Sequence, residues 1–413
     1  MTVSSQSAAA QPLAGIRVTD FTWIGAGSYT TKMLADSGAD VVKIESADRI
    51  DSLRLAAPYK DGIKGVNRSG YFADRNSSKR SLTLNMKHPR AIELVSRLIV
   101  QSDVIANNFT PGVMDRFGLG YEAVRRIKPG IIYLAMSMQG ASGPESGYLG
   151  YGATMAAVTG IQHLTGLPGR EPAGTGTNYP DHLPNPCHAT FAVLAALRHR
   201  RRTGQGQYID MAQTEPTIAL LGPQVMDYTV NGINAGPRGN ASSDDAAPYG
   251  AYPCAGEDRW IALGVHDDGQ WARLVEALGR PDWATQAAFA SAEGRRAHRA
   301  DLDALLAKQT AGFDASALAQ TLQAAGIPAA RVSTAADVIE DPQLAHRGHW
   351  LTLDHPEMGP SLYNAQPFRM KHAPPGGRRP APLLGQHTHE VCRDLLGLSP
   401  EDIEALEADG ALT

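Results

Sequence analysis

The sequence is poor in cysteine, and its three cysteines form no recognisable site. Cys187, Cys254 and Cys392 are widely spaced among 413 residues. That spacing gives neither a disulfide framework nor the closely spaced ligands that bind metal ions. We therefore expect a protein of a reducing compartment, the cytoplasm, without a metal site.

The sequence also lacks a basic surplus and a long apolar segment. It has 38 Lys and Arg against 42 Asp and Glu, a net charge of −4, and so gives no sign of binding nucleic acid or an anionic membrane. No apolar run approaches the ~20 residues of a membrane span. Residues 1–12 have no charged segment followed by an apolar core, so we expect a polar tail rather than a signal peptide. These absences predict a soluble globular protein.

Segments typical of strands and helices alternate through the first 140 residues. β-branched runs at 15–22 and 39–45 enclose a helix-like segment at 28–38, which predicts a β–α–β unit with parallel strands. The pattern continues with strands expected at 81–86, 103–109 and 130–140, and helices at 90–102 and 121–129. The sequence therefore predicts an α/β fold with a doubly wound, Rossmann-like sheet.

The composition changes after two further helices, expected at 188–203 and 211–229. Segment 231–250 is rich in Gly, Asn, Ser and Asp, as linkers and mobile loops are. A smaller α+β block follows, with strands expected at 251–256 and 259–265 and helices near 270–279, 293–311 and 315–325. We place boundaries near 228 and 335, which gives the segments 1–227, 228–335 and 336–413.

Two features mark the C-terminal segment. A Pro- and Gly-rich stretch lies near 368–380. The chain then closes with two helices, and we expect Ser399 to cap the second, because Pro400 suits the first turn of a helix.

The motif Gly25-Ala26-Gly27 follows the first expected strand, and Glu45 ends the second. This arrangement imitates a dinucleotide-binding fingerprint, but Thr30 stands where its third glycine belongs. An NAD-dependent oxidoreductase is thus one alternative. A tight turn of any α/β protein is another, and a loop that admits a different nucleotide-bearing ligand is a third.

Cations gather near the ends of the third and fourth expected strands. Segment 76–87 carries three of them, including Lys87, and Arg116 follows the strand at 103–109. Ligands of open α/β sheets bind at the carboxyl ends of strands, where cations suit phosphates. Any one of these side chains is more simply a solvated surface charge, so only the group suggests a polyanionic ligand.

Asp181 stands between Pro180 and Pro184, before an apolar segment with no charge until Arg198. We expect the prolines to hold Asp181 outside the helix, just before its positive end, which favours the ionised carboxylate. A fixed, anionic carboxylate is a candidate nucleophile. A helix cap or turn residue is the simpler interpretation.

Taken together, five motifs resemble those of the class III (CaiB/BaiF-type) CoA-transferase family, to which formyl-CoA:oxalate and carnitine CoA-transferases belong. They occur in the family's order and cover nearly the whole chain: L-x-G-I-R-V-x-D-F-T (13–22), N-x-x-K-R-S-L-x-L-N-M-K (76–87), N-N-F-x-P-G-V-M-D-R-F-G-L (107–119), L-A-A-L-R-x-R-R-x-T-G-x-G-Q-Y-I-D (194–210) and P-L-L-G-Q-H-T (382–388).

The resemblance assigns the catalytic nucleophile to Asp181, the only carboxylate between Glu171 and Asp210. It implies that CoA is bound by a group of residues in these motifs or in the loop after the first strand: Ile24, Gly25, Ala26, Leu84, Lys87, Asn108, Phe109 and Arg116, with Tyr151 beside the reacting thioester. Ser46 replaces an arginine of the family, and Arg49 is the candidate substitute.

Racemases of α-methylacyl-CoA share this fold and are a further alternative. They need a His-Asp pair just before the position of Tyr151, where this sequence has Gly147 and Tyr148. Proton removal and return on opposite faces needs two bases, so the transferase interpretation is favoured. A catalytically silent subunit is also conceivable, although the presence of Asp181 counts against it.

The resemblance implies transfer of CoA from an acyl-CoA donor to a carboxylic acid through an aspartyl mixed anhydride and an enzyme–CoA thioester. CoA is then a substrate, and no permanently bound cofactor is needed. The turn around Asp181 is similar to that of transferases acting on succinyl groups. The implied architecture is a large Rossmann-like domain built from both chain ends, an inserted small domain, and an interlocked homodimer.

Overall fold

A computed structural model describes residues 11–241, 246–373 and 379–413. Most of the expected N-terminal tail, and parts of the segments 231–250 and 368–380, lie outside these residues. The chain divides into two compact units. Unit 1 comprises Met1–His163, Gly174–Ala235 and Gln343–Thr413, and unit 2 comprises Leu164–Ala173 and Gly236–Pro342.

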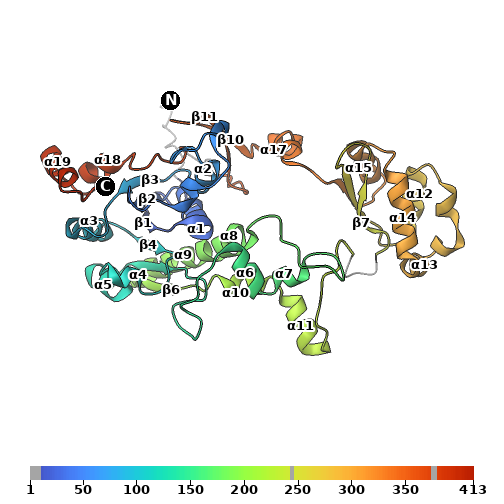
Figure 1. Ribbon diagram of the computed structural model, residues 1–413, viewed down its shortest axis with the longest axis horizontal. Coiled ribbons are helices and arrows are strands. Elements are labelled where there is room, and N and C mark those ends of the chain that lie inside the picture. Colours follow the sequence, from blue (N-terminus) through green and yellow to red (C-terminus); the bar gives the residue numbers. More distant parts are fainter. Residues whose placement is uncertain (1–10, 242–245, 374–378) are drawn as a thin grey trace, which may run out of the picture. The chain divides into compact units, whose positions relative to one another are not determined.

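Unit 1 is built on a six-stranded parallel sheet with the order β3-β2-β1-β4-β5-β6 (Figure 1). Thr19 of β1 lies opposite Val42 of β2 on one side and Ile105 of β4 on the other. The order reverses between β1 and β4, the position where open α/β sheets bind ligands. The strands are β1 (Arg17–Phe21), β2 (Asp40–Glu45), β3 (Arg80–Thr83), β4 (Val104–Asn107), β5 (Ile132–Ala135) and β6 (Gln207–Asp210).

The expected parallel α/β sheet is confirmed, and helices cover both of its faces. Neighbouring residues of a strand point to opposite faces, so Ile105 belongs to one hydrophobic cluster while Val104 and Ala106 belong to another. The Ile105 cluster includes side chains of α3 (Pro89–Val100), α5 (Tyr121–Ile127), α18 (Thr388–Asp394) and α19 (Pro400–Ala408). The other includes those of α1 (Ile24–Asp36) and α9 (Pro184–Thr203).

Several element boundaries differ from the expectations. Helix α1 begins at Ile24, so Gly25-Ala26-Gly27 forms its first turn instead of a loop before it. The expected helix at 211–229 is two helices, α10 (Thr214–Ala219) and α11 (Gly222–Asn231), and Pro223 lies in the first turn of the second, where proline is well tolerated. Strand β6 was not expected, because four residues are too short a run to show an alternating pattern and two of them, Gln207 and Asp210, are polar.

The remaining elements of unit 1 are short. Ser399 caps α19 as expected, in a capping box with Asp402. The antiparallel pair β10–β11 lies in the C-terminal part of the chain. The bounds are α2 (Gly70–Arg75), α4 (Val113–Arg116), α6 (Gly152–Val158), α8 (Tyr179–His182), β10 (Trp350–His355) and β11 (Gly359–Asn364), with 3₁₀ turns at Ser52–Leu55 and Lys60–Gly62. Helices α7 (Ile161–Leu164) and α17 (Pro342–Arg347) span unit boundaries.

Unit 2 has its own antiparallel sheet, in the order β7-β8-β9, and its own hydrophobic core around Trp271, Phe289 and Leu302. Its elements are β7 (Tyr249–Pro253), β8 (Trp260–Gly264), α12 (Asp268–Ala277), α13 (Ala292–Ala297), α14 (Arg299–Thr310), α15 (Ala315–Ala324), β9 (Ala329–Arg331) and α16 (Ala335–Ile339), with 3₁₀ turns at Asp282–Thr285 and Ala287–Phe289. Among the described residues of both units, no helix is long and apolar enough to cross a membrane.

Candidate active site

A cavity of about 320 Å³ lies in unit 1, beside the start of α1 and the residues that follow β4. Its volume falls in the range of about 300–1,000 Å³ that is usual for small-molecule sites. Seven of the ten expected site residues line it: Ile24, Gly25, Ala26, Asn108, Phe109, Tyr151 and Asp181. Thr110, Val113, Ser137, Met138, Tyr148, Leu149, Gly150 and Gln213 complete the lining.

Asp181 reaches this cavity from the short helix α8, which differs from the expected non-helical turn. Pro180 lies in the first turn of α8, a position that lacks an intrahelical hydrogen-bond partner and so tolerates proline. The break comes one residue before Pro184, at Leu183, whose φ and ψ of −131° and −72° are not helical. Helix α9 starts there at Pro184, four residues earlier than expected.

The carboxyl group of Asp181 is buried, with only 3% of the residue exposed. Burial raises the pKa of Asp181 to about 6, although the Gly152 backbone N–H and the Arg75 guanidinium act to lower it. Desolvation is thus the largest effect on this pKa, and it opposes the ionised form that a helix end was expected to favour. A carboxyl group with this pKa is still mainly ionised at pH 7, so it remains competent as a nucleophile.

Two glycines of α1 permit close packing around the cavity. A Cβ atom on Gly25 would lie 2.8 Å from the Cβ of Asp181 and 3.2 Å from its Oδ2. A Cβ on Gly27 would lie 2.6 Å from the Cβ of Thr22 and 2.8 Å from the Cγ of Asn108. The Gly25-Ala26-Gly27 motif is thus explained by packing against Asp181 and Asn108.

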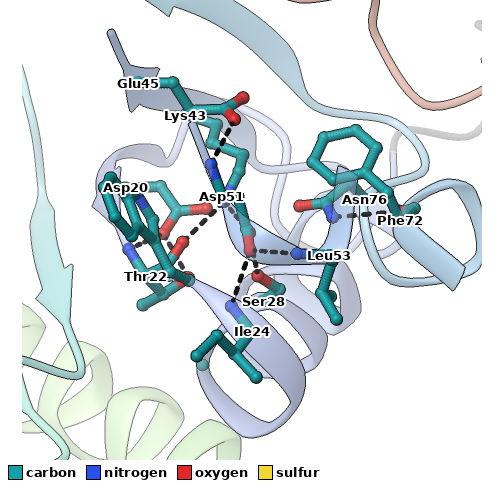
Figure 2. A network of polar contacts seen from close by, with 12 residues as sticks. Asp20, Thr22, Ile24, Ser28, Lys43, Glu45, Asp51, Leu53, Phe72 and Asn76 are labelled. Carbon is teal, nitrogen blue, oxygen red and sulfur yellow. Dashed lines mark hydrogen bonds and ion pairs between the residues drawn. The ribbon is translucent and has the colours of Figure 1, made fainter. Parts of the chain in front are cut away.

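Ile24, the residue before Gly25, has a φ of +59°. Positive φ is rare for a β-branched side chain, and such strain costs on the order of 1–3 kcal/mol. Its backbone N–H donates to Oδ1 of Asp51 at 3.0 Å (Figure 2). The cavity therefore has a strained wall that neighbouring side chains hold in place.

Asn108 and Phe109 both contact Trp23. Asn108 Oδ1 accepts from the Trp23 backbone N–H at 2.8 Å, and its Nδ2 donates to the Trp23 carbonyl at 2.7 Å. The Phe109 and Trp23 rings pack edge to face, with centroids 5.5 Å apart. These contacts fix the turn between β1 and α1.

The environment of α8 includes residues that the sequence did not reveal. The His182 ring lies between the hydroxyl groups of Tyr71, 2.8 Å from Nε2, and Thr177, 3.1 Å from Nδ1. Burial, assisted by the Arg75 charge, lowers the pKa of His182 to about 4, so this ring is neutral at pH 7. His182 could have been found from the sequence because it directly follows Asp181. Tyr71 and Arg75 lie more than 100 positions before Asp181, so the sequence gives no sign that they are close to it.

Three expected CoA contacts do not line the cavity. Leu84 is fully buried in the hydrophobic core of the sheet, while Lys87 and Arg116 are exposed at the surface. Ser46 is buried and forms an isolated β-bridge with Arg49, which is itself exposed. The cavity thus gathers Asp181, Tyr151 and five of the expected CoA contacts, and leaves Leu84 and the two cations outside.

Comparisons with known proteins agree on one family. The model of CoA-transferase family III matches residues 13–388. The succinyl-CoA–D-citramalate CoA-transferase of Chloroflexus aurantiacus is 33% identical over 96% of this chain and 97% of its own. The succinyl-CoA:mesaconate CoA-transferase of Haloarcula marismortui is 34% identical over 91% of this chain and 94% of its own.

A solved structure supports the same conclusion. The crystal structure of a CAIB/BAIF family protein from Brucella suis is 32% identical, with a TM-score of 0.86 over 94% of this chain and all of that one. The resemblance read from the five sequence motifs is thereby confirmed, as is the expected enzyme class. The chain belongs to CoA-transferase family III and transfers CoA between acids.

Proposed function

We propose that this enzyme transfers CoA from succinyl-CoA to a second dicarboxylic acid by way of an acylated Asp181. The names of similar enzymes support this choice of substrates, since those enzymes pair succinate or succinyl-CoA with citramalate, glutarate or mesaconate. The burial of the Asp181 carboxylate inside the cavity carries the proposal.

The proposed reaction starts with attack of an Asp181 oxygen on the thioester carbonyl, which breaks the C–S bond and releases CoA thiolate. The thiolate then attacks Cγ of Asp181 in the mixed anhydride, expels the donor acid and forms an aspartyl–CoA thioester. The acceptor carboxylate attacks Cγ next, releases the thiolate and forms a second anhydride. Attack of the thiolate on the acceptor acyl carbon yields the new acyl-CoA and regenerates Asp181.

Exclusion of water is as important as the nucleophile, because hydrolysis of either anhydride would waste the donor. Asp181 is almost wholly buried, and Ile24, Phe109, Val113 and Met138 give the cavity apolar walls. These features support a site that protects an acylated intermediate.

We propose that CoA extends out of the cavity to the exposed cations Lys87 and Arg116, with Arg49 in place of the missing arginine at Ser46. The thioester and the phosphates lie at opposite ends of CoA, so one cavity of about 320 Å³ need hold only the reacting end. The exposed positions of these three side chains leave their charges available to phosphates.

We further propose that units 1 and 2 are the large and small domains and that two copies of the chain interlock in the cytoplasm. None of the described residues that line the cavity is Lys, Arg or His, so the second carboxylate of a dicarboxylic substrate lacks a charge partner there. A second copy is one source of that cation. Exposed apolar side chains on α9 and α11, including Phe191, Met226 and Val230, also favour assembly.

The test of the nucleophile is Asp181→Asn, which keeps the shape of the side chain but is a poor nucleophile. With succinyl-CoA present, hydroxylamine should convert Asp181 of the wild type to a hydroxamate and inactivate it. Borohydride should reduce the enzyme–CoA thioester at the same residue. Transfer by Asp181→Asn should fall by several orders of magnitude while CoA binding, measured by calorimetry, persists. Wild-type turnover in this variant, or a label mapped elsewhere by mass spectrometry, would refute the proposal.

A further inference from the structure

The strained Ile24 raises the question of what holds it. A non-glycine residue stays at positive φ only where its surroundings fix it, and such residues cluster at functional sites. Ile24 and Gly25 both line the cavity, and Gly25 lies against Asp181. The strained residue, Ile24, is therefore the direct neighbour of Gly25, the residue that lies against Asp181.

Three consecutive backbone residues at this point are each fixed by a side chain distant in sequence. Lys43 Nζ donates to the Thr22 carbonyl at 2.6 Å, and Asn108 holds both the N–H and the carbonyl of Trp23. Asp51 accepts from the Ile24 N–H through Oδ1. The turn from β1 into α1 is thus held on both sides, from the cavity by Asn108 and from the protein interior by Lys43 and Asp51.

Lys43 and Asp51 form the interior half of this support (Figure 2). Lys43 Nζ lies 2.9 Å from Asp51 Oδ2, and neither side chain is exposed. Asp51 Oδ1 also accepts from the Leu53 N–H at 3.0 Å, so both carboxylate oxygens are occupied. Although burial alone would raise the pKa of Asp51, the Lys43 ammonium and the backbone donors hold it below its usual value.

A buried ion pair of this kind is weak evidence for stability, because desolvation of both charges offsets their attraction. Its geometry, however, places one acceptor at the N–H of the strained residue and one donor at a carbonyl two residues earlier. Besides the ion pair, Lys43 donates to the Thr22 carbonyl of this turn, and Asp51 accepts from the Ile24 N–H of the turn as well as from Leu53 and the Ser28 hydroxyl. A positioning role accounts for this arrangement where a purely stabilising one does not.

We propose that Lys43 and Asp51 are positioning residues for the transfer reaction, which hold Ile24 at positive φ so that Gly25 supports the Asp181 carboxylate in its reactive place. The proposal rests on the proposed role of Asp181 as nucleophile. Neither Lys43 nor Asp51 lines the cavity, so they act through the turn.

The tight contact at Gly25 explains why the turn must not shift. No space for even a methyl group separates Gly25 from Asp181. If Ile24 relaxed to negative φ, Gly25 would move toward or away from the carboxylate. A displacement of ~1 Å at a reacting group can cost about a hundredfold in rate.

The experiment compares Asp51→Asn with the matched control Asp36→Asn. Asp36 is also buried in unit 1 and paired with a lysine, Lys32, but it lies at the far end of α1. Asp51→Asn sets an amide NH2 group against the Lys43 ammonium, which should turn the side chain away from Lys43 and the Ile24 N–H. Acylation of Asp181, measured as the rate of hydroxamate formation, should therefore slow by about a hundredfold. Asp36→Asn should lower the unfolding temperature and leave that rate within a few-fold of wild type.

A second pair of variants tests whether the effect passes through Ile24. Glycine adopts positive φ without strain, so an Ile24→Gly background should no longer depend on Asp51. Adding Asp51→Asn to Ile24→Gly should therefore cost only a few-fold in rate, and the cycle should show strong coupling between the two positions. An equal loss in both backgrounds would overturn the proposal.

Folding failure of Asp51→Asn does not remove the test. Asp51→Glu keeps the charge beside Lys43 and displaces the acceptor by one methylene group, so it should fold and still lose acylation rate. A wild-type acylation rate in folded Asp51→Glu or Asp51→Asn would refute the positioning role. Absence of a hydroxamate on Asp181 in the wild-type enzyme would instead refute the nucleophile.

Discussion

Burial of Asp181 has two opposite consequences for its chemistry. Removal from water makes its oxygens more basic and exposes them to fewer competing hydrogen bonds, which favours attack on a carbonyl. The same desolvation penalises the ionised form, which is the form that attacks in the proposed reaction. With a pKa of about 6, the enzyme keeps most of the carboxylate ionised at neutral pH and still carries the energetic cost of the buried charge.

The cost of burying the ionised Asp181 carboxylate predicts how the free energy of unfolding depends on pH. The folded protein holds a proton on Asp181 between pH 3.8 and about 6, whereas the unfolded chain has lost it. Stability therefore falls as the pH rises through this window, and the full penalty, up to about 3 kcal/mol for two pKa units, persists above it. Asp181→Asn should be more stable than the wild type at pH 7.5, and the gain should shrink towards pH 4.

Thermal unfolding of the two proteins across this pH range measures the effect. The Asp36→Asn variant is a suitable comparison, because Asp36 is a buried carboxylate paired with Lys32 and its loss should destabilise at pH 7.5. If Asp181→Asn is less stable than the wild type at every pH, burial does not penalise the ionised Asp181.

Individual residues also show what the sequence can and cannot reveal about the site. Asn108 belongs to one of the five family motifs, Gly25 follows another and Asp181 precedes a third, and the cavity brings the three together. Arg75 was not found, because its contact with the site depends on the folded position of α2. The strain at Ile24 was equally invisible, since backbone dihedral angles follow from the surrounding contacts and not from the residue type.

At the scale of elements, the site depends on how closely α1 approaches α8. Helix composition did not predict that α1 starts at Ile24, because two glycines in a first turn disfavour a helix. The structure explains them by the lack of space beside Asp181 and Asn108. The elements α3, β1 and β2 were predicted well, because their apolar residues in the sequence are the ones that the fold buries. The short, half-exposed β6 was not predicted.

The close approach of α1 and α8 predicts the effect of Gly25→Ala. Alanine favours a helix over glycine by about 1 kcal/mol, but its Cβ would overlap Asp181. We expect the variant to fold and to lose about a hundredfold in turnover, because the carboxylate must move.

Gly222→Ala is the matched control for that variant. Gly222 lies in the first turn of α11, where an added Cβ meets nothing within 4 Å, so activity should be retained. Steady-state transfer assays on both variants check the expectation, and wild-type turnover in Gly25→Ala would show that Asp181 has more room than the structure gives it.

At the scale of the whole molecule, the proposed interlocked homodimer makes the clearest prediction. Phe191 on α9 is 72% exposed in a single chain, an unusual position for a large aromatic side chain unless a second copy covers it. Phe191→Asp should prevent assembly and abolish transfer. Val100→Asp on α3, at an exposed apolar position of the other helical layer, should assemble normally.

Sedimentation of the three proteins at nanomolar concentration measures their assembly. Interlocked chains cannot separate without unfolding, so the wild type should remain dimeric on dilution. A compact wild-type monomer in equilibrium with dimer would contradict the interlocked arrangement, and a dimeric, active Phe191→Asp would place the interface elsewhere.

The residues on the two sides of the cavity differ in how freely they can be replaced by other amino acids. On one side, Gly25 has no room for a methyl group, and hydrogen bonds from the backbone to Asp51 and Asn108 hold the turn beside it. On the other, Tyr148 and Leu149 are 54% and 78% exposed in the single chain, so their replacement disturbs little within it. Divergence of this scaffold towards new acids, in nature or in the laboratory, should therefore concentrate at Tyr148 and Leu149, while the wall beneath Asp181 stays constant across enzymes with different substrates.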